Sequence, residues 1–260
     1  MKRIILSLLI LLIVFSTNGL AYLEGDGTDD SISCGSDSSI DDIFASGGTI
    51  SMWFRIDTFS TSPTRRIFDK TCDPGVCLYI FISGAEDRFE FDKSFTGTNG
   101  AWVFNDIVND TNIHHFALTY DQDSLLNDPI IYIDGSPTTG TEVLTPTLIA
   151  DSDAASTLYF FNRADGARPF DGLKGSICAW SNILTEAQID IISNAKVSGM
   201  ERQVSPSTLI DCWLLNDQPE GTSGDGDTFV SLTGANNCTG SDGANNTGLT
   251  ARAENTLTYP

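Results

Sequence analysis

Three carboxylates stand close together near the start of the chain. Asp26, Asp29 and Asp30 occur in the run LEGDGTDD, which is rich in turn-forming residues. Calcium in proteins takes six to eight oxygen ligands, which the carboxylates and backbone carbonyls of acidic loops supply. The cluster therefore predicts a calcium site at this turn. The alternative is that these aspartates only shape the turn.

A second pair of carboxylates could support acid–base chemistry. Glycosidases use two carboxyl groups that flank the bond to be cleaved. Glu90 and Asp92 lie two residues apart, so they share one face of a strand. Position 94 is serine, however, which leaves the E-x-D-x-(x)-E pattern of laminarinase-type hydrolases incomplete. We expect a solvated edge strand here and no catalytic residue.

Sugar recognition would need an exposed aromatic face beside hydrogen-bonding side chains. Trp102 is the main aromatic candidate, and Arg163 and Arg168 in a polar loop are the candidate donors. Trp180 is a further candidate, whereas Trp53 is expected in the core. The adjacent histidines 114 and 115 would alternate faces in a strand, so one is expected to be packed and the other exposed.

The cysteines predict disulfides. The sequence holds six: Cys34, Cys72, Cys77, Cys178, Cys212 and Cys238. Cys72 and Cys77 bracket the turn sequence Asp-Pro-Gly and are the most favoured pair. Cys212–Cys238 would close a loop rich in glycine and aspartate, and Cys34–Cys178 would then remain. Sequence alone leaves other pairings open.

The first residues are typical of a secretory signal peptide. Residues 1–21 begin with Lys2 and Arg3, continue with an apolar run over 4–15, and end with small residues. That run is far shorter than the roughly 20 residues that a membrane-spanning helix needs. We therefore expect a secreted protein without a transmembrane anchor, in keeping with an even number of cysteines.

The charge of the chain excludes some partners. The net charge is −21, and removal of 1–21 would make it −23, because Lys2 and Arg3 are lost and no acidic residue is. Binding to nucleic acid depends on clustered lysine and arginine that neutralise phosphates. Nucleic acid and anionic membranes are therefore unsuitable partners, whereas cations are suitable ones.

Short runs rich in Ile, Val, Phe, Tyr and Thr recur along the chain, separated by turn residues. They cover 49–56, 77–83, 88–92, 101–107, 114–120, 129–133, 158–161, 175–180 and 209–215. This spacing predicts an all-β, antiparallel two-sheet β-sandwich. One short helix is expected over 184–193, where Thr185 and Gln188 have capping-box spacing.

Several of these segments resemble the laminin-G-like, concanavalin A-type lectin/glucanase jelly roll. The segments that carry the resemblance are GGTISMWF, HHFALTYD followed by IYIDG, FDGLKGSI with LTEAQI, and the opening LEGDGTDD. The resemblance implies a jelly-roll domain over 22–215, with a polar Gly/Asn-rich extension over 216–260 that packs on it or trails from it. It also implies that Trp53 faces the core.

The resemblance adds a second calcium candidate and a class of function. By alignment with the pentraxins, a calcium ion could be held by Asp69 or Asp73 together with Asn162 and Asp165. The implied function is a secreted, non-catalytic binding module for carbohydrate or a surface ligand, with calcium as a candidate cofactor. The implied partner is a glycan or an extracellular protein. The alternative is a structural or adhesive protein of a cell surface, filament or virion, and a glycoside hydrolase ranks third.

Overall fold

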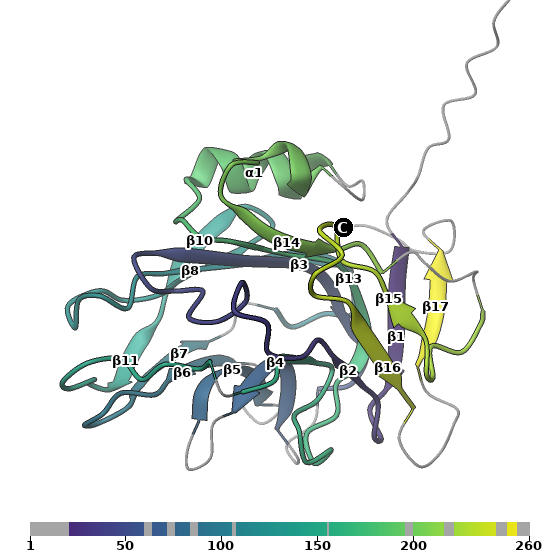
Figure 1. Cartoon of the computed structure of the whole chain (residues 1–260), viewed down its shortest axis with the longest axis horizontal. Coiled ribbons are helices and arrows are strands. Elements are labelled where there is room, and N and C mark those ends of the chain that lie inside the picture. Colours follow the sequence, from purple (N-terminus) through teal and green to yellow (C-terminus); the bar gives the residue numbers. More distant parts are fainter. Residues whose placement is uncertain are drawn as a thin grey trace, which may run out of the picture.

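The computed structural model of the chain describes residues 21–59, 64–71, 76–83, 88–105, 108–154, 156–195, 200–215, 221–242 and 249–253. Two stacked sheets form the body, and one helix lies over the outer face of the upper sheet (Figure 1). The named strands of the described part pair in antiparallel fashion throughout. The predicted antiparallel β-sandwich is confirmed.

The upper sheet has eight strands. Its order is β10 (Ser136–Thr139), β9 (Ile130–Ile133), β8 (His114–Tyr120), β3 (Gly48–Ile56), β13 (Asp171–Trp180), β1 (Ala21–Asp26) and β17 (Thr250–Ala253). The eighth strand, β14 (Leu209–Trp213), pairs with the second half of β13, whereas β1 pairs with its first half. The long strand β13 thus has β3 on one side and both β1 and β14 on the other, which places it inside the sheet.

The lower sheet has nine strands. Its order is β11 (Thr141–Leu144), β7 (Gly100–Asn105), β6 (Arg88–Lys93), β5 (Val76–Ser83), β4 (Arg65–Thr71), β12 (Tyr159–Phe160), β2 (Ser31–Ser33), β16 (Cys238–Ser241) and β15 (Thr228–Phe229). The edges of this sheet are therefore β11 and β15.

The core between the sheets is built by strict alternation. On β3, Ile50, Met52, Phe54 and Ile56 face the lower sheet and are buried. The lower sheet contributes aromatic side chains to the same core, among which Phe91 stacks on Trp102 with ring centroids 5.9 Å apart. This interior is largely apolar. Lys174 of β13 is a buried exception, and its Nζ donates to the carbonyl oxygens of Arg66 and Ile67 in the lower sheet.

Trp53 is buried, but on the opposite side of β3 from the one expected. It belongs to a small cluster with Tyr22, Ile113 and Leu173 on the outer face of the upper sheet. Because successive side chains point to opposite faces, Met52 and Phe54 exclude Trp53 from the interior. The expectation that Trp53 faces the sandwich core is therefore wrong, although the residue is only 1% exposed.

The helix α1 (Glu186–Ala195) lies on the outer face of the upper sheet. Its predicted capping box is present: the Thr185 hydroxyl accepts from Gln188 N at 3.3 Å, and Gln188 Oε1 accepts from Thr185 N at 2.9 Å. Ile189 and Ile192 pack on Tyr132 and Trp180 of the sheet. A single 3-10 turn, η1 (Glu201–Gln203), precedes β14.

The C-terminal segment completes both sheets. β17 pairs with β1 and β16 pairs with β2, so the sandwich extends well past Leu215. The buried carboxylate of Asp211 fastens this segment, because it accepts from the hydroxyl of Thr233 at 2.6 Å and from the amide of Asn236 at 2.7 Å.

The disulfides differ from those expected. The structure joins Cys34 to Cys238 and Cys178 to Cys212, so the pairs Cys34–Cys178 and Cys212–Cys238 are wrong. The reason is the strand order: Cys178 and Cys212 face each other on β13 and β14, while Cys34 follows β2, the partner of β16. The pair Cys72–Cys77 lies outside the residues whose side chains are described.

Residues 1–20, the expected signal peptide, also lie outside the described part of the chain. Within that part, none of the helices combines the length and the apolar character needed to cross a membrane.

The two ends of β3 define two ends of the molecule. At the first, Ile56 pairs with Gly172, next to the turn that follows β1. At the second, Gly48 pairs with Tyr120, next to the loop between β8 and β9. The groups that could bind ligands gather at these two ends.

Candidate functional site

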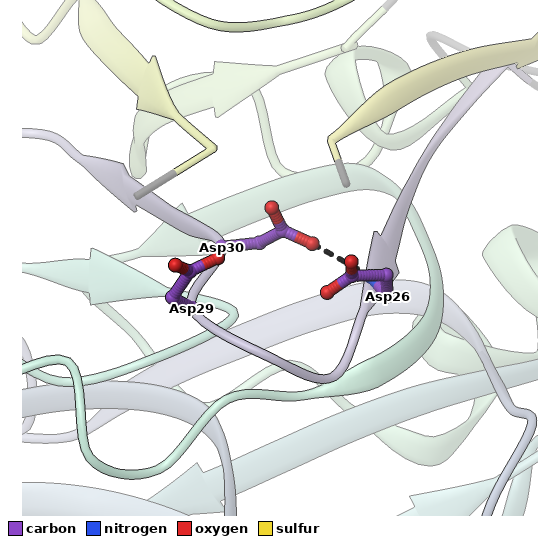
Figure 2. A group of neighbouring side chains, drawn as sticks. All are labelled: Asp26, Asp29 and Asp30. Carbon is purple, nitrogen blue, oxygen red and sulfur yellow. Dashed lines mark hydrogen bonds between the residues drawn. The ribbon is translucent and has the colours of Figure 1, made fainter. Parts of the chain in front are cut away.

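The acidic turn at the first end connects β1 to β2. Asp26, Asp29 and Asp30 each bring one carboxylate oxygen to within 4.8 Å of the others, and Figure 2 shows the three side chains around the turn. Gly27 makes the turn possible, because its φ of +74° is a conformation that other residues rarely adopt. A side chain at Gly27 would also meet Arg65 and Asp171.

Asp30 is the buried member of this group. Its Oδ2 accepts from Asp26 N at 2.6 Å, whereas its Oδ1 has no hydrogen-bond partner among the described residues. Burial, together with the negative charges of Asp26, Asp242 and Asp29, raises the pKa of Asp30 to about 7, although the hydrogen bond from Asp26 N opposes this rise. A fully buried carboxylate with an unused oxygen is costly unless a cation compensates it.

These residues fit a calcium ion. All the donors are carboxylate oxygens, the type that calcium prefers, and calcium–oxygen distances of about 2.3–2.6 Å allow two ligands to lie up to roughly 5 Å apart. The separations in the turn stay within that limit. Aspartate in turns also bonds its own backbone, as Asp26 does with Thr28 N at 2.8 Å, but such bonds leave carboxylate lone pairs free.

The loop 162–168 lies against this turn. The buried amide of Asn162 donates to the carbonyl oxygens of Asp30 and Gly166, each at 3.2 Å. Its Oδ1 accepts from the backbone of Arg163 at 3.0 Å and of Arg168 at 2.8 Å. Asn162 therefore joins the turn and the loop into one edge and fixes where Arg163 and Arg168 leave the backbone.

In the second predicted calcium cluster, the described ligand groups are bound by other residues of the chain. Asp69 is bound by Arg66 Nε at 3.0 Å, and Asp165 by Arg163 through Nε at 2.6 Å. The arginine also lowers the pKa of Asp165 to about 2. The side-chain oxygen of Asn162 is occupied as well, by the backbone N–H groups of Arg163 and Arg168. An ion at this place would therefore have to displace the arginine partners of Asp69, Asp165 and Asn162. Asp73 lies outside the described residues.

Trp102 cannot stack on a sugar. Its side chain is completely buried between the sheets, and its indole N–H donates to Asp128 Oδ1 at 2.7 Å. The expectation of an exposed Trp102 is therefore wrong, because residue 102 falls on the inward face of β7 together with Phe104. Trp180 is buried too, under the helix, and donates to Val204 O at 2.9 Å.

Both histidines are buried, so the expectation that one is exposed is wrong. His114 bridges two carboxylates, with Nδ1 at 2.7 Å from Asp134 and Nε2 at 2.9 Å from Asp110. Burial alone would lower the pKa of His114, but the hydrogen bonds and charges of these carboxylates outweigh it, and the pKa is raised. His115 faces Trp53 instead, and burial lowers its pKa to about 4.

Glu90 and Asp92 share the outer face of β6, as predicted, since Phe89 and Phe91 occupy the inner face. The expectation of a solvated edge strand is wrong, because β6 lies between β7 and β5 and both carboxylates are half-buried. Glu90 lies 3.4 Å from Arg88. Burial raises the pKa of Asp92 to about 7, against the attraction of Arg66. A raised carboxyl pKa is one requirement of a general acid, but it is also what partial burial alone produces.

The structure has two hollows at the second end of the molecule that were not predicted from the sequence. One, of about 340 Å³, is lined on one side by Asp121, Asn127 and Asp128 and on the other by Tyr132. The other, of about 360 Å³, lies between the β8–β9 loop and the segment after β11. The only signal in the sequence is the pair of leucines at 125 and 126 inside an otherwise polar loop.

Residues 26–190 match the sequence model of a family described as the concanavalin A-like lectin/glucanases superfamily. No curated protein matches the chain. A solved structure of a Bacteroides ovatus protein, provisionally described as carbohydrate binding, aligns with a TM-score of 0.63 and 19% identity. That alignment covers 93% of this chain and 62% of the other. This chain thus spans less than two thirds of that protein.

Two binding domains have weaker similarity. The binding domain of botulinum neurotoxin DC, solved with rat synaptotagmin II, has a TM-score of 0.45 and 14% identity over 70% of this chain and 48% of the toxin chain. The binding domain of Paraclostridial Mosquitocidal Protein 1 has a TM-score of 0.48 and 15% identity, over 66% and 42%.

Proposed function

This chain belongs to the concanavalin A-like lectin/glucanases superfamily, and on that premise we propose that it is a secreted, non-catalytic module that binds carbohydrate with the help of calcium. The observation that carries the proposal is the carboxylate of Asp30, which is buried, keeps one oxygen without a partner among the described residues, and adjoins two further carboxylates. Secretion is supported by the signal-like start of the sequence and by the two described disulfides.

Calcium would be held by Asp26, Asp29 and Asp30. The ion would supply the positive charge that three adjacent carboxylates lack and would remove the cost of burying Asp30. It would also stiffen the turn and, through Asn162, the loop 162–168. The bound ion would thereby fix the direction of Arg163 and Arg168.

The carbohydrate would bind at this same edge. Arg163 and Arg168 are partly exposed and offer hydrogen-bond donors that match sugar hydroxyls. Because Trp102 and Trp180 are buried, recognition here would depend on hydrogen bonds more than on ring stacking. The Bacteroides ovatus neighbour, described as carbohydrate binding, supports this choice of ligand class.

Thermal unfolding with calcium and with chelator tests the ion. At a hundredfold excess over the dissociation constant, calcium bound only to the folded state should stabilise it by about 2.7 kcal/mol and raise Tm by several degrees. Asp30→Asn should abolish this response. It should also raise the stability of the calcium-free protein, because a buried charge is removed.

Glu142→Gln is the matched control, because it removes one exposed carboxylate from β11, remote from the turn in sequence. This variant should keep the full response to calcium. A wild-type Tm that is the same in calcium and in chelator would refute the calcium site.

A glycan array, probed with wild type and with Arg163→Ala, tests the ligand. Binding that requires calcium and is weakened in the variant supports a lectin-like module. Absence of sugar binding, together with ordered assembly in size-exclusion chromatography, would favour the structural or adhesive alternative.

One observation favours a second candidate function, glycoside hydrolysis. The raised pKa of Asp92, beside Glu90 on the same strand face, is compatible with an acid catalyst. Release of reducing sugar from β-glucans that is lost in Glu90→Gln would establish this activity. We expect no release from either protein.

A further inference from the structure

Large apolar side chains are exposed at the second end of the molecule. In the β8–β9 loop Leu126 is 92% exposed and Leu125 is 39% exposed. Across the hollow, in the segment after β11, Leu148 is 63% and Ile149 is 74% exposed. Single exposed leucines are ordinary, but a group of them around a hollow is typical of an interaction surface.

The walls of this hollow are held in place. On one side the segment after β11 follows the β6–β7 connection, with Thr147 N donating to Thr98 O at 3.0 Å and Thr96 N donating to Ile149 O at 2.9 Å. On the other side Gln122 N donates to Phe44 O at 3.1 Å. The hollow of about 360 Å³ is therefore preformed and large enough for apolar side chains.

An open strand edge lies next to these walls. β11 is the last strand of the lower sheet and pairs only with β7, so its outer backbone row has no neighbouring strand in the described part of the chain. All four of its residues are exposed, including Val143 and Leu144. Such an edge can accept an extended peptide as an additional strand.

The segments that form this surface carry acidic residues but no lysine or arginine. No lysine or arginine occurs between Lys93 and Arg163, a stretch that contains the whole surface. Its acidic residues near the hollows and the edge are Asp121, Asp123, Asp128 and Glu142. A partner must therefore combine apolar side chains with positive charge.

We propose that β11 and the adjoining hollow bind an extended segment of a partner protein in which apolar and basic residues alternate. The segment adds to the edge of β11, alternate side chains enter the hollow beside Leu125 and Ile149, and basic side chains meet Asp123 and Glu142. A second copy of this chain is a poorer occupant, because it would bring its own acidic residues to the same place. A sugar is also poorer, because four of the residues that line this hollow, Leu125, Leu148, Ile149 and Ala150, have apolar side chains that cannot bond hydroxyl groups.

The probe is a synthetic peptide in which lysine and valine alternate, and the control peptide alternates glutamate and valine. We expect the lysine peptide to bind the full chain and the glutamate peptide not to bind. The affinity should fall at about 0.5 M salt, because screening weakens the attraction. Amide hydrogen exchange over residues 141–144 should slow on binding, which a contact through side chains alone would not cause.

The paired variant Leu125→Ser with Ile149→Ser should weaken binding about tenfold or more, with an unchanged Tm because both side chains are exposed. Asp30→Asn should bind the peptide like wild type, with or without calcium, so failure of the calcium site leaves this inference intact. Equal binding of the two peptides, or full binding by the paired variant, would overturn the proposal. A wild-type dimer that the paired variant abolishes would assign the surface to a second copy and would also overturn it.

Discussion

Neighbouring histidines on β8 respond to pH in opposite directions, because successive side chains of a strand point to opposite faces. His114 reaches Asp134 and Asp110, which hold its pKa above the ordinary value. Its contribution to stability is therefore complete below about pH 6.5 and is lost as the pH rises through the raised pKa. His115, whose pKa is about 4, destabilises the fold as the pH falls from about 6.5 towards 4.

His114→Gln should lower the free energy of unfolding by roughly 1 kcal/mol at pH 5.5, since two charge-assisted hydrogen bonds to partly exposed carboxylates are lost. The loss should shrink by pH 9, where the histidine of the wild type is neutral. Urea unfolding at both pH values measures it. His115→Phe serves as the contrast and should improve stability in acid. An equal loss from His114→Gln at both pH values would contradict this account.

Trp53→Ala should cost about 3–5 kcal/mol, because a large buried side chain is removed. The loss would come from the outer cluster with Tyr22 and Leu173, not from the interior. Near-ultraviolet circular dichroism and urea unfolding of this variant, beside Met52→Ala for the interior face, separate the two clusters. A variant as stable as wild type would mean that the outer cluster contributes nothing.

The elements were predictable where a pattern is local. The capping box of Thr185 and Gln188, the strand at Gly48–Ile56 and the antiparallel class all follow from neighbouring residues. The same holds for the acidic turn, because its three aspartates lie within five positions of one another. Features that depend on distant partners were not predictable. The hydrogen bond from Trp102 to Asp128 and the pairing of β2 with β16 form only in the folded protein.

The disulfides belong to this second class, and their strengths should differ. Cys34–Cys238 closes a separation of 204 residues and Cys178–Cys212 one of 34. In the chain-entropy description their removal should cost at most about 5 and about 4 kcal/mol, respectively. Paired cysteine-to-serine variants, examined by thermal unfolding, would show this order. Peptide mapping that finds Cys34 joined to Cys178 would contradict both pairings.

On the scale of the whole molecule, the two proposed binding surfaces lie at opposite ends of one sandwich. The acidic turn is next to the Ile56 end of β3, and the hollow with β11 is next to the Gly48 end. A glycan at the first end and a polypeptide at the second could therefore be held together without competing. The apolar core between them makes independent binding the expected behaviour.

The C-terminal strands are part of this body and not an appendage. A chain ended after Leu215 would lose β15, β16 and β17 and the bond from Cys34, leaving the edges of β1 and β2 open. We expect it to aggregate or to remain unfolded. Size-exclusion chromatography and far-ultraviolet circular dichroism would test this, with the full chain as control. A monomeric, folded product would show that residues 22–215 suffice.

The pairing of β1 with β17 also determines how the molecule responds to a pulling force. Ala21 and Ala253 are direct partners in an antiparallel pair, so tension applied through them would separate the two strands one bond at a time, as in a zipper. Peeling of this kind needs little force. The disulfide between Cys34 and Cys238 stops the peeling. It carries the tension itself, so the chain between these two residues is not pulled until the disulfide is cut. The chain would therefore extend by on the order of 100 Å and then hold, a two-stage tether with a fixed limit.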